Sequence, residues 1–171
     1  MSVREIQGPI KEQYREDPQA AWITLRATGA GVGSDAMSCS VDLGRALYAA
    51  GAHPGVGGEG SSACSGDLLL GALAACAQIT CQMVASAMGL EGAQVGVTVE
   101  GDLDLRGTLG TAEVPVGFQS IRIRFDVTGV DLAPDRLERF KERTEKYCVV
   151  LQTLLTPPAI DHAWTVDGAA A

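Results

Sequence analysis

Five cysteines are the residues of this 171-residue chain with the clearest capacity for chemistry. They are Cys39, Cys64, Cys76, Cys81 and Cys148. An odd number with irregular spacing is not typical of the disulfide framework of a small secreted protein. We therefore interpret them as free thiols of a cytoplasmic protein, at least one of which could act as a nucleophile.

Other kinds of chemistry find little support in the sequence. His53 and His162 are far apart, and no Cys-x-x-Cys, His-x-x-His or His-Glu-x-x-His spacing occurs, so we expect no metal. The glycines of residues 51–60 match neither a dinucleotide fingerprint nor a P-loop, so we expect no cofactor. A net charge of −8 argues against a nucleic-acid partner and an anionic membrane surface. The longest apolar run, residues 68–77, is too short to cross a bilayer.

The elements that must position the thiols begin after a polar N-terminal arm, residues 1–19. Alternating apolar and polar residues predict an antiparallel hairpin joined by a Gly-rich turn at 29–35. The expected strands are residues 21–28 and 37–43, with 45–49 as a possible third. A Gly/Ser-rich loop over residues 51–66 follows, and loops of this length often carry function. We interpret Glu59 in that loop as a solvated acid.

A central helix is predicted over residues 68–88. Almost no charge interrupts this segment, and a helix that is apolar on all faces is expected to be buried on all faces. Ser65 is the expected N-cap, and Asp67 falls in the first turn, where the helix dipole favours a carboxylate. Gly89 is expected to end the helix.

The second half of the chain repeats the strand pattern. Residues 95–105 and 121–127 alternate, which predicts an antiparallel pair with one face buried and one in water. Acids of the first strand could lie opposite Arg122 and Arg124. A further strand is expected over residues 160–166.

An amphipathic helix is predicted over residues 135–147, after Pro134. Its apolar stripe consists of Leu137, Phe140, Thr144, Tyr147 and Cys148, and its charged face is expected to lie in water. The order of elements predicts an α+β fold, with helices against antiparallel sheet in a single domain over residues 20–168.

Two of the cysteines could meet inside this fold. Cys76 lies on the central helix and Cys148 ends the amphipathic stripe, so both are expected to point inward. Because cysteine is among the most buried residue types, two inert core thiols are the alternative. We interpret Cys39 and Cys81 as core residues. Cys64 is either a bystander loop thiol or a thiol activated by the dipole of the helix that follows it.

Two motifs resemble those of the OsmC/Ohr family of thiol-dependent peroxide-detoxifying proteins. The stretch from Gly57 to Cys76 is similar to the family's Gly-rich loop, acidic residue, Leu/Ala helix and first cysteine. The segment Glu145-Lys146-Tyr147-Cys148 is similar to its second-cysteine motif. The resemblance implies an OsmC-like fold, in which antiparallel sheets pack around a buried central helix. It also implies an intertwined homodimer with two sites at its interface.

The resemblance further implies a peroxidase mechanism without a cofactor. Cys76 would attack a peroxide as a thiolate and become a sulfenic acid, and Cys148 would resolve it as a disulfide. A dithiol reductant would then reset the pair. Such a protein would reduce organic hydroperoxides or hydrogen peroxide in oxidative stress defence. The alternative is a non-catalytic OsmC-like module that binds a small apolar ligand or senses redox state.

The sequence departs from the family's peroxidase pattern at three positions. The expected Arg falls near Gly31, where the chain has no Arg. The expected Glu falls on Gly66, although the adjacent Asp67 matches an acidic position of the wider OsmC-like branch and is a candidate catalytic residue. A Pro common after the second cysteine is Val149 here.

A cation near Cys76 is nevertheless expected. Burial in apolar surroundings opposes ionisation of a thiol, and a position in the helix interior gains little from the helix dipole. Arg26 is the candidate nearest to the family's Arg position, with Arg122 and Arg124 as alternatives from the sheet. We expect Tyr147, next to Cys148, to lie in the core with its hydroxyl bonded to a partner.

Overall fold

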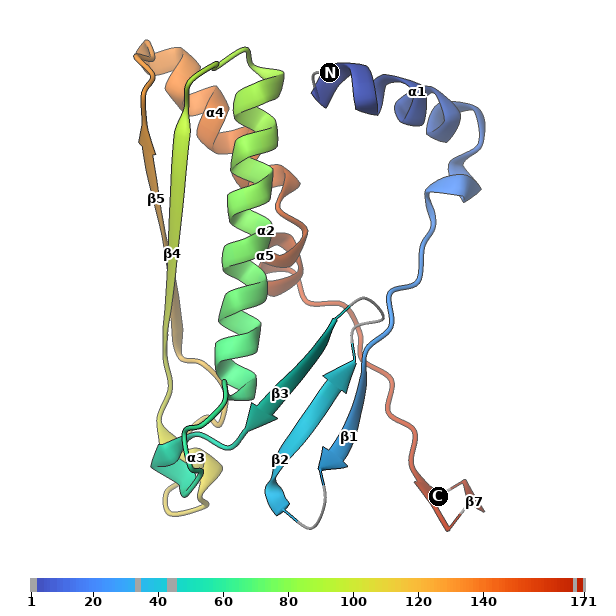
Figure 1. Ribbon diagram of the computed structural model, residues 1–171, viewed down its shortest axis with the longest axis vertical. Helices are drawn as coiled ribbons and strands as arrows, with labels where there is room; N and C mark the ends of the chain where they lie inside the picture. The colour runs from blue at the N-terminus through green and yellow to red at the C-terminus, as the bar shows by residue number, and fades with distance from the viewer. Residues whose placement is uncertain (1–2, 33–34, 43–45, 168, 171) are drawn as a thin grey trace.

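The computed structural model describes residues 3–32, 35–42, 46–167 and 169–170. These residues form three antiparallel sheets, ordered β1–β2–β3, β4–β5 and β6–β7, together with five α-helices and two short 3-10 helices. Figure 1 shows their arrangement. The elements are α1 (Val3–Glu16), η1 (Pro18–Ala21), β1 (Thr28–Val32), β2 (Asp35–Asp42), β3 (Leu47–Gly51), η2 (Pro54–Val56), α2 (Ser65–Ala87), β4 (Gln94–Asp102), α3 (Leu105–Thr108), β5 (Ser120–Thr128), α4 (Pro134–Tyr147), α5 (Val149–Leu155), β6 (Thr165–Val166) and β7 (Ala169–Ala170). This mixture of helices and small antiparallel sheets confirms the α+β class.

The N-terminal region differs from the prediction. Helix α1 occupies most of the expected polar arm, and it lies beside the C-terminal end of α2 (Figure 1). The side chain of Arg4 donates to the carbonyl of Ala87, and the Nε2 atom of Gln7 lies 3.8 Å from the sulfur of Met83. These contacts hold the first helix against the central one.

The strand predicted over residues 21–28 is wrong. Residues 22–27 are extended but pair with no strand in the described structure, and β1 begins only at Thr28. Trp22, Ile23 and Leu25 are 74–86% exposed, so the alternating pattern is present without a partner to bury it. A strand needs such a partner, which local alternation cannot reveal.

Strands β1 to β3 form the first sheet. Strand β2 pairs antiparallel with β1, from Thr28 opposite Asp42 to Gly31 opposite Cys39, and with β3 on its other side. The predicted hairpin is therefore present, but with its first strand in the region predicted as the turn. The predicted third strand is β3, shifted to Leu47–Gly51.

Helix α2 contributes the main core of the molecule. Its buried residues follow one stripe: Leu73, Ala77, Thr80, Cys81, Val84 and Ala85. This stripe packs against β4, α4 and α5. Leu73 and Ala77 have no exposed surface, so this part of the helix is fully excluded from solvent.

A stripe beside the buried one is largely uncovered on α2, although Gln7 of α1 contacts Met83. Leu69, Ile79 and Met83 are 39%, 55% and 37% exposed, so the expectation of burial on all faces is wrong for the single chain. In the described part of the chain, α2 is the one helix long and apolar enough to cross a membrane by length and composition. Large apolar side chains gathered on one stripe of a packed helix are typical of an interaction surface.

Strands β4 and β5 form the sheet that lies against α2. Their register places Glu100 opposite Arg122, as predicted, but the residue opposite Arg124 is Thr98 and not an acid. The alternate residues are apolar and half-buried, and they pack toward α2. Strand β4 ends at Asp102, before the predicted boundary, because Asp104 caps the short helix α3.

The C-terminal part contains a helix break that the sequence pattern did not predict. Helix α4 ends at Tyr147, and a second helix, α5, begins at Val149. Cys148, between them, has φ −77° and ψ 100°, which is extended backbone. The predicted closing strand is reduced to Thr165–Val166, preceded by an extended, exposed segment.

Candidate active site

Cys76 and Cys148 meet in the core beneath α2. Both belong to one apolar cluster, in which they pack with Leu73 and Ala77. Their thiols are within hydrogen-bonding reach of each other, and neither is engaged in a disulfide. Cys148 is fully buried, whereas Cys76 retains some exposure. The structure thus brings together the two thiols that the sequence singled out.

Regular spacing on α4 explains how Cys148 reaches this position. Phe140, Thr144 and Cys148 follow at intervals of four residues, and all three are buried. Tyr147, predicted in the core with them, is instead 58% exposed because its position lies on the outer side of that stripe. The ammonium group of Lys146 lies 5.6 Å from the centroid of the Tyr147 ring.

The surroundings of Cys76 favour its thiolate form. Burial raises the pKa of the Cys76 thiol, but hydrogen bonds outweigh that effect. The donors are the backbone N–H of Val150, the thiol of Cys148, the hydroxyl of Thr80 and the backbone N–H of Val149. The pKa of Cys76 therefore lies below the ordinary value of a thiol.

Cys148 shifts in the opposite direction. Burial raises its pKa, and the hydrogen bond and charge of Cys76 raise it further, although the backbone N–H groups of Leu151 and Val150 oppose the rise. The two neighbouring thiols therefore differ: Cys76 ionises first, and Cys148 stays protonated beside it. This asymmetry suits one sulfur to attack and the other to follow.

The predicted cations are not at this site in the single chain. Arg26 is exposed in the extended segment before β1, and in the described residues no contact joins it to either cysteine. Arg122 and Arg124 lie on the outer face of β5, alternating with Ile121 and Ile123, which pack toward the cysteine cluster.

These sheet arginines also have partners of their own. Arg122 forms a two-pronged ion pair with Asp102, one arm of which measures 3.1 Å, and it holds the pKa of that carboxyl well below its usual range. Arg124 pairs with Asp126 at 3.0 Å. Neither is therefore the cation of Cys76 within one chain.

Asp67 lies at the beginning of α2, far from the cysteine pair. Its carboxylate accepts a hydrogen bond of 2.9 Å from the backbone N–H of Cys64, which holds its pKa below the ordinary value. In return, the sulfur of Cys64 accepts a bond of 3.4 Å from the N–H of Asp67. Cys64, not Ser65, is thus the N-cap, in a reciprocal capping box. Nine residues of helix separate Asp67 from Cys76, about 14 Å along the axis.

The chain matches the family model for OsmC-like proteins over residues 58–163, more than half of its length. It belongs to the OsmC-like protein family. This confirms the resemblance stated from its two cysteine motifs. No curated protein matches the sequence.

Solved structures show the same fold at low identity. An OsmC-like protein from Mycoplasma pneumoniae is 18% identical with a TM-score of 0.64, over 79% of this chain and 89% of that one. An organic hydroperoxide resistance protein OsmC from Legionella pneumophila is 19% identical with a TM-score of 0.56, over 80% and 92%. An organic hydroperoxide resistance protein from Elizabethkingia anophelis is 15% identical with a TM-score of 0.54, over 80% and 91%.

The glycine at position 66 of this OsmC-like chain has a packing reason. A Cβ atom there would lie 3.3 Å from the ring of Phe118, and one at Gly101 would lie 2.7 Å from the same ring. The aromatic ring therefore packs directly on Gly66 in the first turn of α2 and on Gly101 in β4. A glutamate at position 66, as in the peroxidase pattern, would press against this ring.

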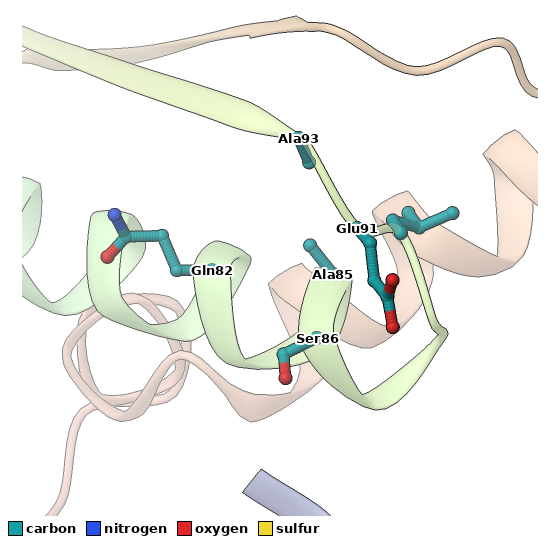
Figure 2. A pocket seen from close by; sticks show the side chains of 6 residues that line it. Gln82, Ala85, Ser86, Glu91 and Ala93 are labelled. Atoms are coloured by element: carbon teal, nitrogen blue, oxygen red, sulfur yellow. The ribbon is translucent and has the colours of Figure 1, made fainter. Parts of the chain in front are cut away.

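Two cavities lie at opposite ends of α2, and neither is lined by Cys76 or Cys148. The larger, about 820 Å³, lies at the N-terminal end, between apolar side chains such as Leu70, Leu105 and Phe118, with Cys64 and Asp67 in its wall. The smaller, about 240 Å³, lies at the C-terminal end and is shown in Figure 2, where Gln82, Ser86 and Glu91 supply polar groups.

The remaining candidates take structural positions. Cys81 is buried, as predicted, and burial raises its pKa. Glu59 is exposed in its loop, and the Nδ1 atom of His53 accepts a bond of 3.0 Å from Gly55 within a turn. The side chain of Cys39 lies outside the described residues. Among the residues described, no three His, Cys, Asp or Glu side chains form a cluster that could hold a metal.

Sequence reasoning missed the groups that surround the Cys76 sulfur. Thr80 belongs to the apolar helix that the sequence predicts, and its spacing of four residues from Cys76 is the one signal that could have indicated contact. The amides of Val149 and Val150 point at the sulfur because the chain breaks at Cys148. No side-chain pattern marks a backbone donor, so no sequence signal could have found these two.

Proposed function

We propose that this protein is a thiol peroxidase that reduces organic hydroperoxides or hydrogen peroxide through Cys76 and Cys148. The observation that carries the proposal is the contact between two free thiols whose pKa values are shifted in opposite directions. Groups with perturbed pKa values occur at reactive sites more often than elsewhere. The hydroperoxide resistance named for two of the fold relatives agrees with this chemistry by analogy.

Each step of the proposed reaction balances. The thiolate of Cys76 attacks the distal peroxide oxygen, the O–O bond breaks, and the leaving oxygen takes up a proton to form an alcohol or water. Cys76 is then a sulfenic acid. The sulfur of Cys148 attacks it, forming the disulfide and releasing hydroxide, which leaves as water with the proton of Cys148. A dithiol reductant returns both cysteines to thiols through a mixed disulfide.

We propose further that the protein acts as a homodimer. The uncovered stripe of α2, with Leu69, Ile79 and Met83, supports a second copy as its cover. The exposed apolar side chains of residues 22–25 would gain cover in the same way. In such a dimer, Arg26 of one copy is the candidate cation for the cysteine site of the other copy. Asp67 remains a candidate catalytic residue at the same interface.

The second candidate is a non-catalytic OsmC-like module that binds a small apolar ligand or senses redox state in the cytoplasm. The larger cavity favours it, because its volume and apolar walls suit a small ligand and it lies apart from the cysteine pair. Full burial of Cys148 favours a sensor that reacts once over an enzyme that must be reset.

Peroxide consumption with a dithiol reductant separates the two. Wild type, Cys76→Ser and Cys148→Ser are compared with tert-butyl hydroperoxide and with hydrogen peroxide. The proposal expects repeated turnover by wild type and none by Cys76→Ser. If Cys76→Ser consumed peroxide as fast as wild type, the peroxidase proposal would be refuted. If wild type stopped after one equivalent of peroxide per chain, the result would favour the redox sensor.

A further inference from the structure

The hydroxyl of Thr80 is buried without the backbone bond that threonines in helices usually make. Thr80 is 4% exposed in the middle of α2. Two other threonines in this chain donate to the carbonyl four residues earlier: Thr144 to Phe140 and Thr153 to Val149, each at 2.9 Å. In the described structure no hydrogen bond joins the hydroxyl of Thr80 to the carbonyl four residues before it, and the hydroxyl lies within bonding reach of the Cys76 thiol.

The residue four positions before Thr80 is Cys76. On a helix these two side chains lie one above the other on the same face, so the hydroxyl faces a sulfur instead of the carbonyl. We propose that Thr80 is a catalytic residue that donates its hydroxyl hydrogen to the thiolate of Cys76 and thereby fills part of the place of the absent cation.

The surroundings of Cys76 support this assignment. The sheet presents apolar side chains to the cluster, namely Val97, Val99, Ile121, Ile123 and Phe125. Among the described residues, the one titratable group in contact with Cys76 is Cys148. The hydroxyl of Thr80 is among the bonds that lower the pKa of Cys76. A bond to a charged acceptor is roughly twice as strong as a neutral one, and little water reaches Thr80 to compete.

Threonine also suits the changing charge of this sulfur. The carbonyl of Cys76 stands within the ordinary reach of the same hydroxyl. When the sulfur is oxidised and no longer an anion, the hydroxyl can turn to that carbonyl, because threonine in a helix has two accessible rotamers for this purpose. Thr80 thus stabilises the thiolate selectively without being left buried and unbonded afterwards.

The test is the pH dependence of Cys76 alkylation by iodoacetamide, followed at the level of the Cys76 peptide by mass spectrometry. Thr80→Val keeps the shape and removes the donor, and Thr80→Ser keeps the donor. We expect Thr80→Val to move the midpoint upward by about one pH unit, the effect of losing one bond to a charged group. Thr80→Ser should stay within a few tenths of a unit of wild type.

Thr144→Val is the matched control, since Thr144 is equally buried and its hydroxyl bonds a carbonyl. An unchanged midpoint in Thr80→Val would overturn the proposal, and so would equal shifts in Thr80→Val and Thr144→Val, which would indicate a structural effect. The catalytic consequence rests on the proposed function, but alkylation needs no peroxide. If wild type showed no peroxide turnover while Thr80→Val still shifted the alkylation midpoint upward as expected, the result would count against the peroxidase function and not against the role of Thr80.

Discussion

Val149→Pro tests the role of the backbone amides at the break between α4 and α5. Val149 is the first residue of α5, a position that proline tolerates, and its side chain is 71% exposed. The residue before a proline must be extended, and Cys148 already has φ −77° and ψ 100°. The substitution should therefore fit without strain; besides an exposed side chain, it removes the N–H that donates to the sulfur of Cys76.

The expected effects on stability and on reactivity have opposite signs. A proline at a compatible position reduces the entropy of the unfolded chain, so the free energy of unfolding should rise by about 0.5 kcal/mol. A full hydrogen bond to a charged group corresponds to about one to two pKa units. The Val149 bond is the smallest of the four that favour the Cys76 thiolate. We therefore expect an upward shift of about half a unit.

The assay combines urea denaturation with the pH profile of Cys76 alkylation. Losing the donor disfavours the thiolate, so the thiolate fraction at neutral pH should fall by a factor of about three. Val149→Ala is the control, because it removes the same side chain and keeps the N–H. The reasoning is refuted if Val149→Pro unfolds at clearly lower urea, or if its alkylation profile coincides with that of Val149→Ala.

Three further predictions follow. Cys148→Ser should consume about one equivalent of peroxide and accumulate a sulfenic acid at Cys76, detected by dimedone labelling and mass spectrometry; disulfide-linked product at Cys76 without Cys148 would contradict its resolving role. Ile79→Lys should shift the protein from dimer to monomer in sedimentation velocity, because it places a charge on the uncovered stripe of α2, whereas Glu142→Lys on the exposed face of α4 should not; a dimer that survives Ile79→Lys refutes that interface. Leu73→Ala should lower the free energy of unfolding by about 3 kcal/mol in urea, because Leu73 is fully buried, while Leu155→Ala, at 66% exposed, should change it by less than about 1 kcal/mol; equal effects would mean that Leu73 is not in the core.

The parts of the fold that the sequence predicted best are those with a local physical signature. Strands β4 and β5 alternate strictly, and their register places the charged residues on one face as expected. Helix α2 was evident from its uninterrupted apolar composition. The strand expected at residues 21–28 does not form because, in the described structure, no neighbouring strand pairs with residues 22–27. An alternating pattern alone does not supply that partner.

The candidate site was predictable in its sulfurs and not in their environment. Two inward positions on two helices were enough to pair Cys76 with Cys148, together with the family motifs. The cation was expected because burial raises the pKa of a thiol, and burial does raise the pKa of Cys76. What sequence could not provide was the break at Cys148, which turns two amides toward the sulfur.

This arrangement divides a task that a single guanidinium could perform alone. A guanidinium beside a thiolate supplies charge to the sulfur and has further N–H groups for the leaving oxygen of a peroxide. The hydroxyl of Thr80 and the amides of Val149 and Val150 each have one hydrogen; all three favour the Cys76 thiolate, and that of Val150 is shared with Cys148. The single chain thus accounts for formation of the nucleophile, while a donor for the leaving oxygen must come from solvent or from a second copy. In the proposed dimer, the uncovered stripe of α2 and the exposed segment with Arg26 are the parts of a second copy that we expect to supply this donor.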